Sequence, residues 1–339
     1  MSGEPVRVRT GDLLIKSQLL YQLSYRPTGG LLRKEAEGGQ ALNLRISRHM
    51  LDKCAQHSYM RQMCSALTPD LPFMKMHGLG NDFVVVDARA CDLNITATMA
   101  KGIGDRHFGV GFDQLAVISN GSGDAYLTFY NADGSVSAAC GNATRCIARY
   151  LMDESGADHL HLTTDRGDLV ARDAGNGLTA VNMGQPQLQW DEIPLGHEMD
   201  TLELPIDGVP TATGMGNPHC TFFVPDVAAI DLAQFGPTIE HHSLFPMRTN
   251  VQIAQIVGLD HIRMRVWERG VGVTWASGSS SCATGVAAAR RGLTGRDVRI
   301  DLDGGTLHVN WREDGVWMTG PTMHVFSGTL TSDFLMSLT

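Results

Sequence analysis

The chain has 339 residues, room for about two ordinary domains, and its 43% hydrophobic and 19% charged residues exclude disorder as a general description. Its net charge of −9 at pH 7 argues against nucleic acid as a partner, because neutralising phosphates requires clustered Lys and Arg. The sequence has neither a run of about 18 apolar residues nor an N-terminal signal pattern, so we expect a cytoplasmic protein without a membrane anchor.

Residues 1–73 differ in charge from the rest of the chain. They carry 10 Lys and Arg against 6 Asp and Glu, a net charge of +4, whereas residues 74–339 carry 17 against 30, a net charge of −13. Nothing in this stretch recurs later in the sequence. We therefore predict a poorly ordered N-terminal extension, with a regulatory or docking arm as the alternative.

From residue 74 onward the sequence repeats itself. HGLGNDFVVVD and TGMGNPHCTFFV share Gly-x-Gly-Asn before a β-rich run, and AACGNATRCIARYLM and WASGSSSCATGVAAARRGL share a glycine turn before a helix-forming run. Cys140 follows Asn81 by 59 residues, and Ser277 follows Asn217 by 60. Landmarks that keep their spacing over such a distance indicate two equivalent halves.

Each half is predicted to contain strands around a helix. Alternating apolar runs and Asp-Gly or Gly-Gly hairpin signals indicate mostly antiparallel β structure, and the helices begin near Gly141 and Gly278. We therefore predict an α+β fold of two pseudo-symmetric lobes, each a curved, mostly antiparallel sheet or barrel wrapped around a central helix, with the active site in the cleft between them. The predicted lobes are residues 74–186, to which residues 327–339 return, and residues 187–326.

The cysteines indicate chemistry at no more than one or two positions. Their number is odd and none forms a CxxC pair, which disfavours a disulfide framework or a structural zinc site. We expect reduced thiols, most of them buried as small hydrophobic groups. The seven are Cys54, Cys64, Cys91, Cys140, Cys146, Cys220 and Cys282.

The two helix starts suggest how such a protein would act. Backbone N–H groups in a first helical turn have no partner within the helix and lie at its positive end, so they bind an anion such as a carboxylate. A thiol placed there becomes more acidic, which would make Cys140 partly ionised at neutral pH. If Cys140 and Ser277 face one another, one can remove a proton from a carbon between them while the other returns a proton to the opposite face. That geometry predicts racemisation or epimerisation by two bases.

No cofactor is indicated by the motifs. GLGNDF lacks the third glycine of a dinucleotide loop and the Gly-Lys-Ser/Thr of a phosphate loop, and NPHC and EHHSLF lack metal-ligand spacing. We predict neither cofactor nor metal, so opposed helix dipoles, desolvation and positioned donors would have to stabilise the carbanion.

Several long motifs, taken in order, resemble those of the diaminopimelate epimerase family. The resemblance covers residues 74–339 and is carried by MKMHGLGNDFVVVDA, GDRHFGVGFDQLAV, FYNADGSVSAACGNATRCIARY, MGNPHC, FPMRTNVQ and VWERGVGVTWASGSSSCATGVAA. It implies a two-lobed enzyme without a cofactor that interconverts L,L- and meso-diaminopimelate for lysine and peptidoglycan synthesis. In that family two cysteines at the helix starts act as acid and base, and the enzyme is usually a homodimer.

The resemblance also implies roles for single residues. Cys140 matches the first catalytic cysteine, and His219 and Glu268 match polar groups beside the reacting centre, where Glu268 would receive the substrate ammonium. The backbone amides of Gly141 with Asn142, and of Gly278 with Ser279, match those that hold the reacting carboxylate. The groups that match contacts to the distal end of the substrate and to its remainder are Asn131, Asn217, Asn250, Arg269, Asn81 and Gln114.

The chain departs from the family pattern at the second catalytic cysteine. The pattern Cys-Gly-Ser/Thr-Gly is here Ser277, Gly278, Ser279 and Ser280. Cys282 lies five residues further, about 140° around the helix, so we expect it to pack elsewhere. A helix start lowers a thiol pKa from ~8.5 by about 1.5 units, but an alcohol begins several units higher. Ser277 is therefore expected to need help from His219 or water.

Three interpretations follow from this departure. The chain is a two-base epimerase that tolerates serine, a one-base lyase, dehydratase or racemase of another amino acid that uses Cys140 with Ser277 as proton donor, or a non-catalytic amino-acid-binding protein. Some of the candidate site residues also have a purely structural explanation. Asn81 and Asn217 are also suited to cap turns, and His219 to a buried position.

Overall fold

A computed structural model describes residues 70–91 and 93–339. The predicted N-terminal extension lies outside these residues except for its last four, residues 70–73. The described residues belong to one compact unit. No helix in this part of the chain is long and apolar enough to cross a membrane.

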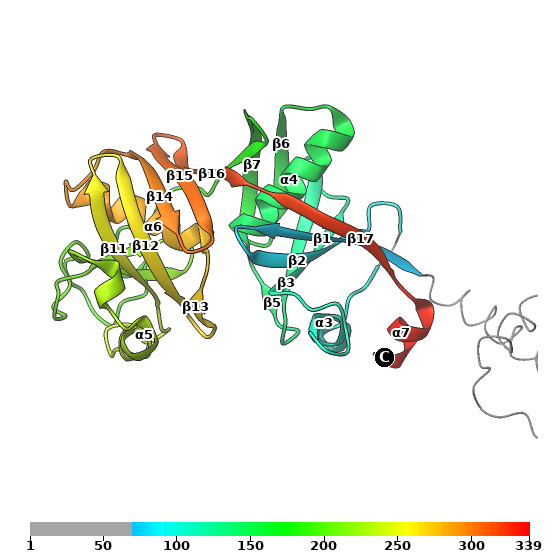
Figure 1. The fold of residues 1–339 in the computed structure, drawn as a ribbon, viewed down its shortest axis with the longest axis horizontal. Coiled ribbons are helices and arrows are strands. Elements are labelled where there is room, and N and C mark those ends of the chain that lie inside the picture. Colours follow the sequence, from blue (N-terminus) through cyan, green and yellow to red (C-terminus); the bar gives the residue numbers. More distant parts are fainter. Residues whose placement is uncertain (1–69, 92) are drawn as a thin grey trace, which may run out of the picture. The chain divides into compact units, whose positions relative to one another are not determined.

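Apart from one 3₁₀ turn in the second set, the elements fall into two successive sets of strands and helices in the same order (Figure 1). The first half comprises β1 (Leu71–Gly78), β2 (Asn81–Asp87), α3 (Ala97–Gly104), β3 (Gln114–Ser119), β4 (Ala125–Asn131), β5 (Val136–Ser137), α4 (Gly141–Ser155), β6 (His159–Thr164), β7 (Gly167–Gly175) and β8 (Leu178–Asn182). The second half comprises β9 (Thr211–Gly214), β10 (Pro218–Phe223), a 3₁₀ turn η1 (Val227–Ala229), α5 (Leu232–Glu240), β11 (Asn250–Gly258), β12 (His261–Glu268), β13 (Gly272–Thr274), α6 (Gly278–Arg290), β14 (Asp297–Leu302), β15 (Gly305–Arg312) and β16 (Gly315–Pro321). The chain then ends with β17 (Met323–Leu330) and α7 (Ser332–Ser337).

The strand pairing repeats between the halves. β2 runs parallel to β3 and β4 parallel to β6, as β10 does to β11 and β12 to β14, whereas the other pairs of strands are antiparallel. The halves join where β8 pairs with β16, and β17 returns to pair with β1. The predicted α+β fold of two equivalent halves is confirmed.

Two helices at equivalent places in the halves, as well as the C-terminal α7, were not among the predicted elements. α3 lies in the chain between the parallel strands β2 and β3, and α5 between the parallel strands β10 and β11. Parallel neighbours require a crossover connection rather than a tight turn, and a helix commonly supplies it. Both helices are short, with 8 and 9 residues, which gave little periodic signal.

The β2 run Phe-Val-Val-Val is apolar at every position because both of its faces are covered. Phe83 and Val85 belong to the core around α4, whereas Val84 and Val86 belong to a second core under α3. Each such side chain contributes about 1.5–3 kcal/mol when it is fully buried. The sheet thus has buried surface on both sides at this point, and its central helix is enclosed.

α6 is enclosed by strands because its side chains are small. Its sequence, GSSSCATGVAAAR, is buried almost continuously as far as Ala288, and it contacts β9, β10, β11, β14, β15 and β16. A Cβ at Gly285 would lie 3.0 Å from Val309 and 3.3 Å from Val298, so this helix packs very closely on the sheet. Cys282 is fully buried here, and the prediction that it packs in the core is confirmed.

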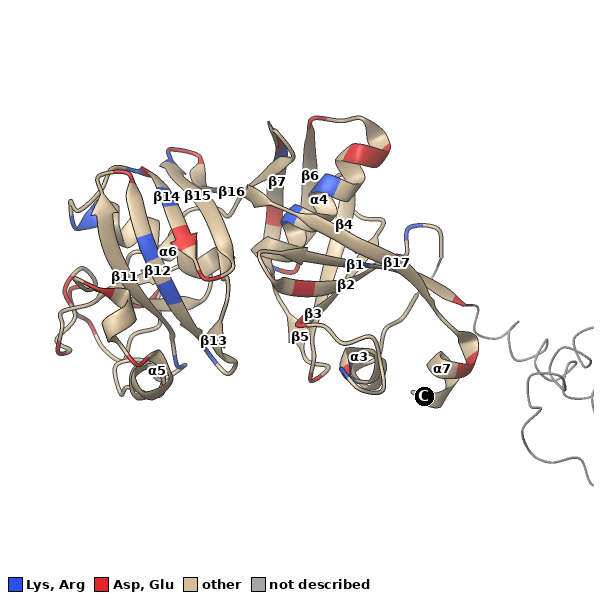
Figure 2. Ribbon diagram, viewed as in Figure 1, with Lys and Arg blue, Asp and Glu red and all other residues tan. Residues whose placement is uncertain are grey.

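Charged residues are interspersed rather than gathered by sign (Figure 2). Arg263 and Arg265 on β12, for example, contact Asp303 just beyond β14. Such partly exposed pairs contribute about 0–1 kcal/mol each.

Candidate active site

Cys140 and Ser277 are the N-cap residues of the two central helices. Both have extended backbone angles, φ −146° and ψ 104° at Cys140 and φ −139° and ψ 119° at Ser277. The Cys140 sulfur accepts a hydrogen bond from the amide of Ala143 at 3.5 Å, whereas the Ser277 hydroxyl makes no such cap. The serine side chain is thereby available to another partner.

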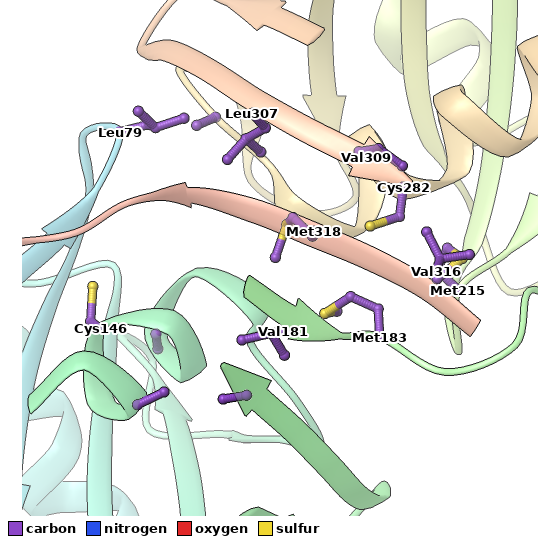
Figure 3. Close-up of a cluster of buried hydrophobic side chains, with 14 of the residues drawn as sticks. Leu79, Cys146, Val181, Met183, Met215, Cys282, Leu307, Val309, Val316 and Met318 are labelled. Atoms are coloured by element: carbon purple, nitrogen blue, oxygen red, sulfur yellow. The ribbon is translucent and has the colours of Figure 1, made fainter. Parts of the chain in front are cut away.

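The two helix starts meet at Met318 of β16. A Cβ at Gly141 would lie 2.9 Å from Met318 Cε, and a Cβ at Gly278 would lie 3.0 Å from the same atom. These two positions are therefore less than about 6 Å apart. Figure 3 shows the Met318 side chain reaching from β16 toward the first half, with Met183 nearby. The first residue of each helix is thus next to the first residue of the other.

The partner of Ser277 is Glu268 at the end of β12. The Ser277 hydroxyl donates to Glu268 Oε2 at 3.0 Å, and the Thr274 hydroxyl donates to Glu268 Oε1 at 2.6 Å. Burial raises the pKa of the Glu268 carboxyl, and the two hydroxyl donors oppose that rise. At this distance a carboxylate is able to accept the proton of the Ser277 hydroxyl.

The expectation that Cys140 is partly ionised is wrong for this structure. The residue is half-buried, but protein surrounds its thiol, and burial raises the pKa of Cys140 to about 12. The amide of Ala143 lowers this pKa and the nearby charge of Glu268 raises it further. Desolvation therefore outweighs the helix start, and Cys140 is a protonated thiol at neutral pH.

His219 is a fully buried, neutral histidine. Its Nδ1 accepts from the Gln252 amide at 3.0 Å, so Nε2 carries the hydrogen and donates to Asn217 Oδ1 at 2.9 Å. Burial lowers the pKa of His219 to about 3, and the charges of Arg166 and Arg269 add to this effect. The structure pairs Ser277 with Glu268 rather than with His219, which instead orients Asn217.

Each Gly-x-Gly-Asn turn is tied to the second residue of the helix in its own half. The Asn142 amide donates to Asn81 Oδ1 at 3.1 Å, and the Asn217 amide donates to Ser279 Oγ at 3.5 Å. These bonds occupy equivalent places in the repeat. They hold the side chains of Asn142 and Ser279 beside the backbone amides that were predicted to bind a carboxylate.

Equivalent strand ends bring together two further pairs of predicted residues. Gln114 at the start of β3 donates from its side chain to Asn131 at the end of β4, at 2.9 Å. In the second half Asn250, at the start of β11, accepts from the backbone N–H of Arg269 at 2.9 Å. The Arg269 guanidinium donates to the Met247 carbonyl at 3.0 Å.

Two cavities adjoin this region. One, of about 190 Å³, is lined by Asn217 and Arg269 together with Gln187 and Glu192. The other, of about 210 Å³, is lined by Gly141 at the start of α4 and by Arg166. Gln114 and Asn131 line neither of these cavities. Of the predicted distal contacts, the structure therefore brings Asn217 and Arg269 to a common cavity.

Sequence reasoning missed several residues that shape the site. Thr274 fixes the Glu268 carboxylate, and the buried carboxylate of Glu240 accepts from the backbone N–H of Gly270 at 2.9 Å, which holds the turn that bears Arg269. The Arg166 guanidinium lies against Gly216, where a Cβ would be 1.8 Å from its central carbon. A threonine, a glutamate and an arginine in loops or at strand ends carry no distinctive local pattern.

The described residues contain no group of three or more His, Cys, Asp or Glu side chains that could hold a metal ion. The five described cysteines are unpaired.

Solved structures of similar fold define the class of the protein. They include a PhzF-family phenazine biosynthesis protein from Bacillus anthracis, with a TM-score of 0.57 and 14% identity over 78% of this chain and 99% of that chain. Another is a hydroxyproline epimerase from Agrobacterium vitis, with a TM-score of 0.56 and 12% identity over 78% of this chain and 93% of that chain. The molecule is thus a two-lobed α+β protein of the fold that these proteins share.

The sequence places the chain within this class. It matches the family described as diaminopimelate epimerase over residues 73–189 and 211–325. Proteins named diaminopimelate epimerase from Rhodospirillum centenum and Acidiphilium cryptum are 51% and 50% identical over 78% of this chain, and the matches cover 93% and 98% of those proteins. The chain belongs to the diaminopimelate epimerase family.

Proposed function

We propose that this protein epimerises L,L-diaminopimelate to meso-diaminopimelate by proton removal and return at the α-carbon, in the formation of lysine and peptidoglycan precursors. The observation that carries the proposal is the meeting of two helix starts, one capped by a thiol and the other by a hydroxyl bound to a carboxylate. The identity to relatives named for this activity supports it. The chemistry proposed uses side chains and backbone amides alone.

The protonation states support different starting roles for the two helix-start residues, Cys140 and Ser277. Burial raises the pKa of Cys140 to about 12, so this residue begins as the acid. Ser277 with ionised Glu268 forms the base: Ser277 takes the α-proton while its own hydroxyl proton moves to Glu268. Cys140 then gives its proton to the other face of the carbanion and becomes a thiolate. In the reverse direction the thiolate removes the proton, and protonated Glu268 returns one through Ser277.

The substrate would be held at both of its ends. The reacting carboxylate would lie on the backbone amides of Gly141, Asn142, Gly278 and Ser279, where first-turn N–H groups bind anions. The distal amino-acid end would occupy the cavity lined by Asn217 and Arg269, with Asn81, Gln114, Asn131 and Asn250 as further contacts. A diamino acid, charged at both ends, fits this division.

Ser277 also favours a second candidate function. A hydroxyl that only donates a proton would leave a one-sided site, and the product would then be an eliminated or differently isomerised amino acid. A binding protein without turnover is the remaining alternative.

One experiment separates these functions. L,L-diaminopimelate is incubated with the protein in heavy water, and the product is analysed by chiral chromatography and mass spectrometry. Inversion with uptake of one deuterium at the α-carbon is the expected result. Loss of water or ammonia supports the one-base function, and neither exchange nor product supports binding alone. A Cys140→Ala variant serves as the control and is expected to be inactive.

We further propose that the protein is a cytoplasmic homodimer. Each subunit would comprise two lobes, one of residues 74–186 with 327–339 and one of residues 187–326. β17 supports the dimer: it pairs with β1 alone among the described strands, and Met323, Val325 and Phe326 on it are about half exposed. An exposed apolar strand with one free edge is suited to pack against a second copy of the chain. Sedimentation of the wild-type protein and of a Phe326→Glu variant tests this, with a dimer and a monomer as the expected results.

A further inference from the structure

Arg145 on α4 is a fully buried side chain whose charge has no counter-ion among the described residues. It is 0% exposed, and no carboxylate lies within 4.0 Å of its guanidinium in this part of the chain. Arginine stays protonated in proteins, so its charge is retained. An unpaired buried charge is strongly unfavourable, and proteins retain one only where something compensates it.

The donors of Arg145 are mostly unused. Nη1 donates to Asn142 Oδ1 at 2.8 Å and contacts Met318 Sδ at 3.2 Å, whereas Nε and Nη2 have no hydrogen-bond partner among the described residues. Glycines at two positions leave room for the group: a Cβ at Gly78 would lie 3.0 Å from Nη2, and one at Gly320 would lie 3.4 Å from Nε. The chain thus encloses a guanidinium without neutralising it.

The position of this cation connects it to the helix starts. Asn142, which accepts from Arg145, is the second residue of α4, and its Oδ1 would lie 3.3 Å from a Cβ at Gly278. Met318, which Arg145 also contacts, is the side chain at which the two helix starts meet. The guanidinium is therefore linked through the Asn142 side chain to the start of α4, close to the first residue of α6.

The other nearby carboxylates are engaged elsewhere. Glu268 accepts from Thr274 and Ser277. Asp113 is connected to Arg145 only indirectly, because the Asn142 side chain donates to Asn81 and the Asn81 side chain donates to Asp113. Asp113 also forms an ion pair with Arg106. Neither provides a direct counter-ion to Arg145.

We propose that Arg145 is a positioning residue: through Asn142, its uncompensated charge attracts the reacting carboxylate, so that the bound substrate is the counter-ion that the free protein lacks. This inference rests on the proposed function. It implies that a charge unfavourable to the free protein becomes favourable when the amino acid binds. Asn142 fixes the geometry by accepting from Arg145 and donating to Asn81.

The test separates affinity from stability. Arg145→Met keeps the apolar stem and removes the charge, and Arg145→Lys keeps a charge. Arg149→Met is the matched control, because Arg149 lies one turn further on α4 and pairs with Asp153 and Asp173. The melting temperature of each free protein is measured by calorimetry. The Kd for an equilibrated mixture of diaminopimelate isomers is measured by titration calorimetry, so that turnover does not alter the ligand.

Arg145→Met is expected to melt at or above the wild-type temperature and to bind at least about tenfold more weakly, with KM rising more than kcat falls. Arg145→Lys is expected to recover most of the affinity, and Arg149→Met to keep wild-type affinity at a slightly lower melting temperature. An Arg145→Met variant that binds like wild type, or that is destabilised or unfolded, would show that Arg145 is structural and would overturn the inference. Wild-type protein that neither binds nor inverts diaminopimelate would instead overturn the proposed function, and this inference with it.

Discussion

The hydroxyl of Ser277 donates a hydrogen bond of 3.0 Å to the carboxylate of Glu268. A lone serine at a helix start is too weak an acid to lose its proton at neutral pH, even with the full effect of the helix dipole. A carboxylate within hydrogen-bond distance changes this, because the proton that leaves the hydroxyl has an acceptor. The departure from the two-cysteine pattern is therefore compatible with two-base chemistry.

Replacing Glu268 with Gln tests this relay. Glutamine retains an acceptor for one hydroxyl but cannot take up a proton, so kcat is expected to fall by about 10²- to 10⁴-fold.

The same substitution tests the pH dependence of stability. Burial raises the pKa of Glu268, so the stability that its protonated form contributes is present at low pH and is lost as pH rises through that raised pKa. At pH 8 the variant, which carries no buried charge at this position, is therefore expected to melt above wild type. Steady-state kinetics and calorimetry provide the measurements, and near-normal turnover would exclude Glu268 as the proton acceptor.

Ser277→Cys restores the thiol of the family pattern. We expect inversion of diaminopimelate to become about tenfold faster, because a thiol yields its proton several pKa units below an alcohol. Ser277→Ala, which cannot relay a proton, is expected to lose inversion. Equal or slower turnover by the cysteine variant would mean that Glu268 already makes the Ser277 hydroxyl as effective a base as a thiol at this position.

The thiol of Cys140 should be unreactive at neutral pH. Because burial raises its pKa to about 12, the thiolate fraction rises about tenfold for each unit by which the pH increases, as long as the pH is below that value. Alkylation by iodoacetamide at Cys140, followed by peptide mass spectrometry, is expected to rise in this way between pH 7 and pH 10. The exposed Cys91 in the same sample provides an internal reference. Rapid, pH-independent alkylation of Cys140 would show that the helix start outweighs burial.

Arg269 is expected to act on binding rather than on chemistry. Its side chain lines the cavity with Asn217, and its backbone N–H bonds Asn250. Arg269→Met keeps the backbone bond and removes the charge, so KM is expected to rise by about 10- to 100-fold while kcat changes little. A variant that loses kcat with unchanged KM would place Arg269 beside the reacting carbon instead.

Shared motifs and their spacing predicted the duplication, and a glycine turn before each helix-forming run predicted both helix starts. A repeat is visible in sequence because equivalent turns need the same residues, as Asn81 and Asn217 illustrate by bonding equivalent helix residues. Helix caps are similarly local, which is why Cys140 and Ser277 could be placed at the first turns.

Features that depend on tertiary packing were not predictable in the same way. The pKa of Cys140 follows from how much protein surrounds its thiol, and no spacing reveals that. The partner of Ser277 is nine residues away in the chain, at the far end of β12, and several hydroxyls and carboxylates were equally plausible there. Arg145 would be expected at the surface of a helix, yet it is fully buried, with Met318 and Gly320 of β16 beside its guanidinium.

The close approach of the helix starts makes Gly278 sensitive to a small substitution. Its φ is not in the left-handed region, so Gly278→Ala adds no backbone strain, but its Cβ would lie 2.8 Å from Met318 Sδ and 3.3 Å from Asn142 Oδ1. Met318 is flexible, whereas Asn142 is held by Arg145 and Asn81, so the added methyl group presses on Asn142 and favours a wider separation of the helix starts. We expect kcat to fall about 100-fold, for a stability loss of about 1–3 kcal/mol.

The control for this substitution is Gly295→Ala beyond the end of α6. A Cβ there meets nothing within 4 Å, and the residue is exposed, so activity and stability are expected to stay at wild-type values. Kinetics and denaturant unfolding of both variants are compared. A Gly278→Ala protein that inverts diaminopimelate at the normal rate would mean that the reaction does not need both helix starts at this separation, since a methyl group between them could then be accommodated without cost to the geometry.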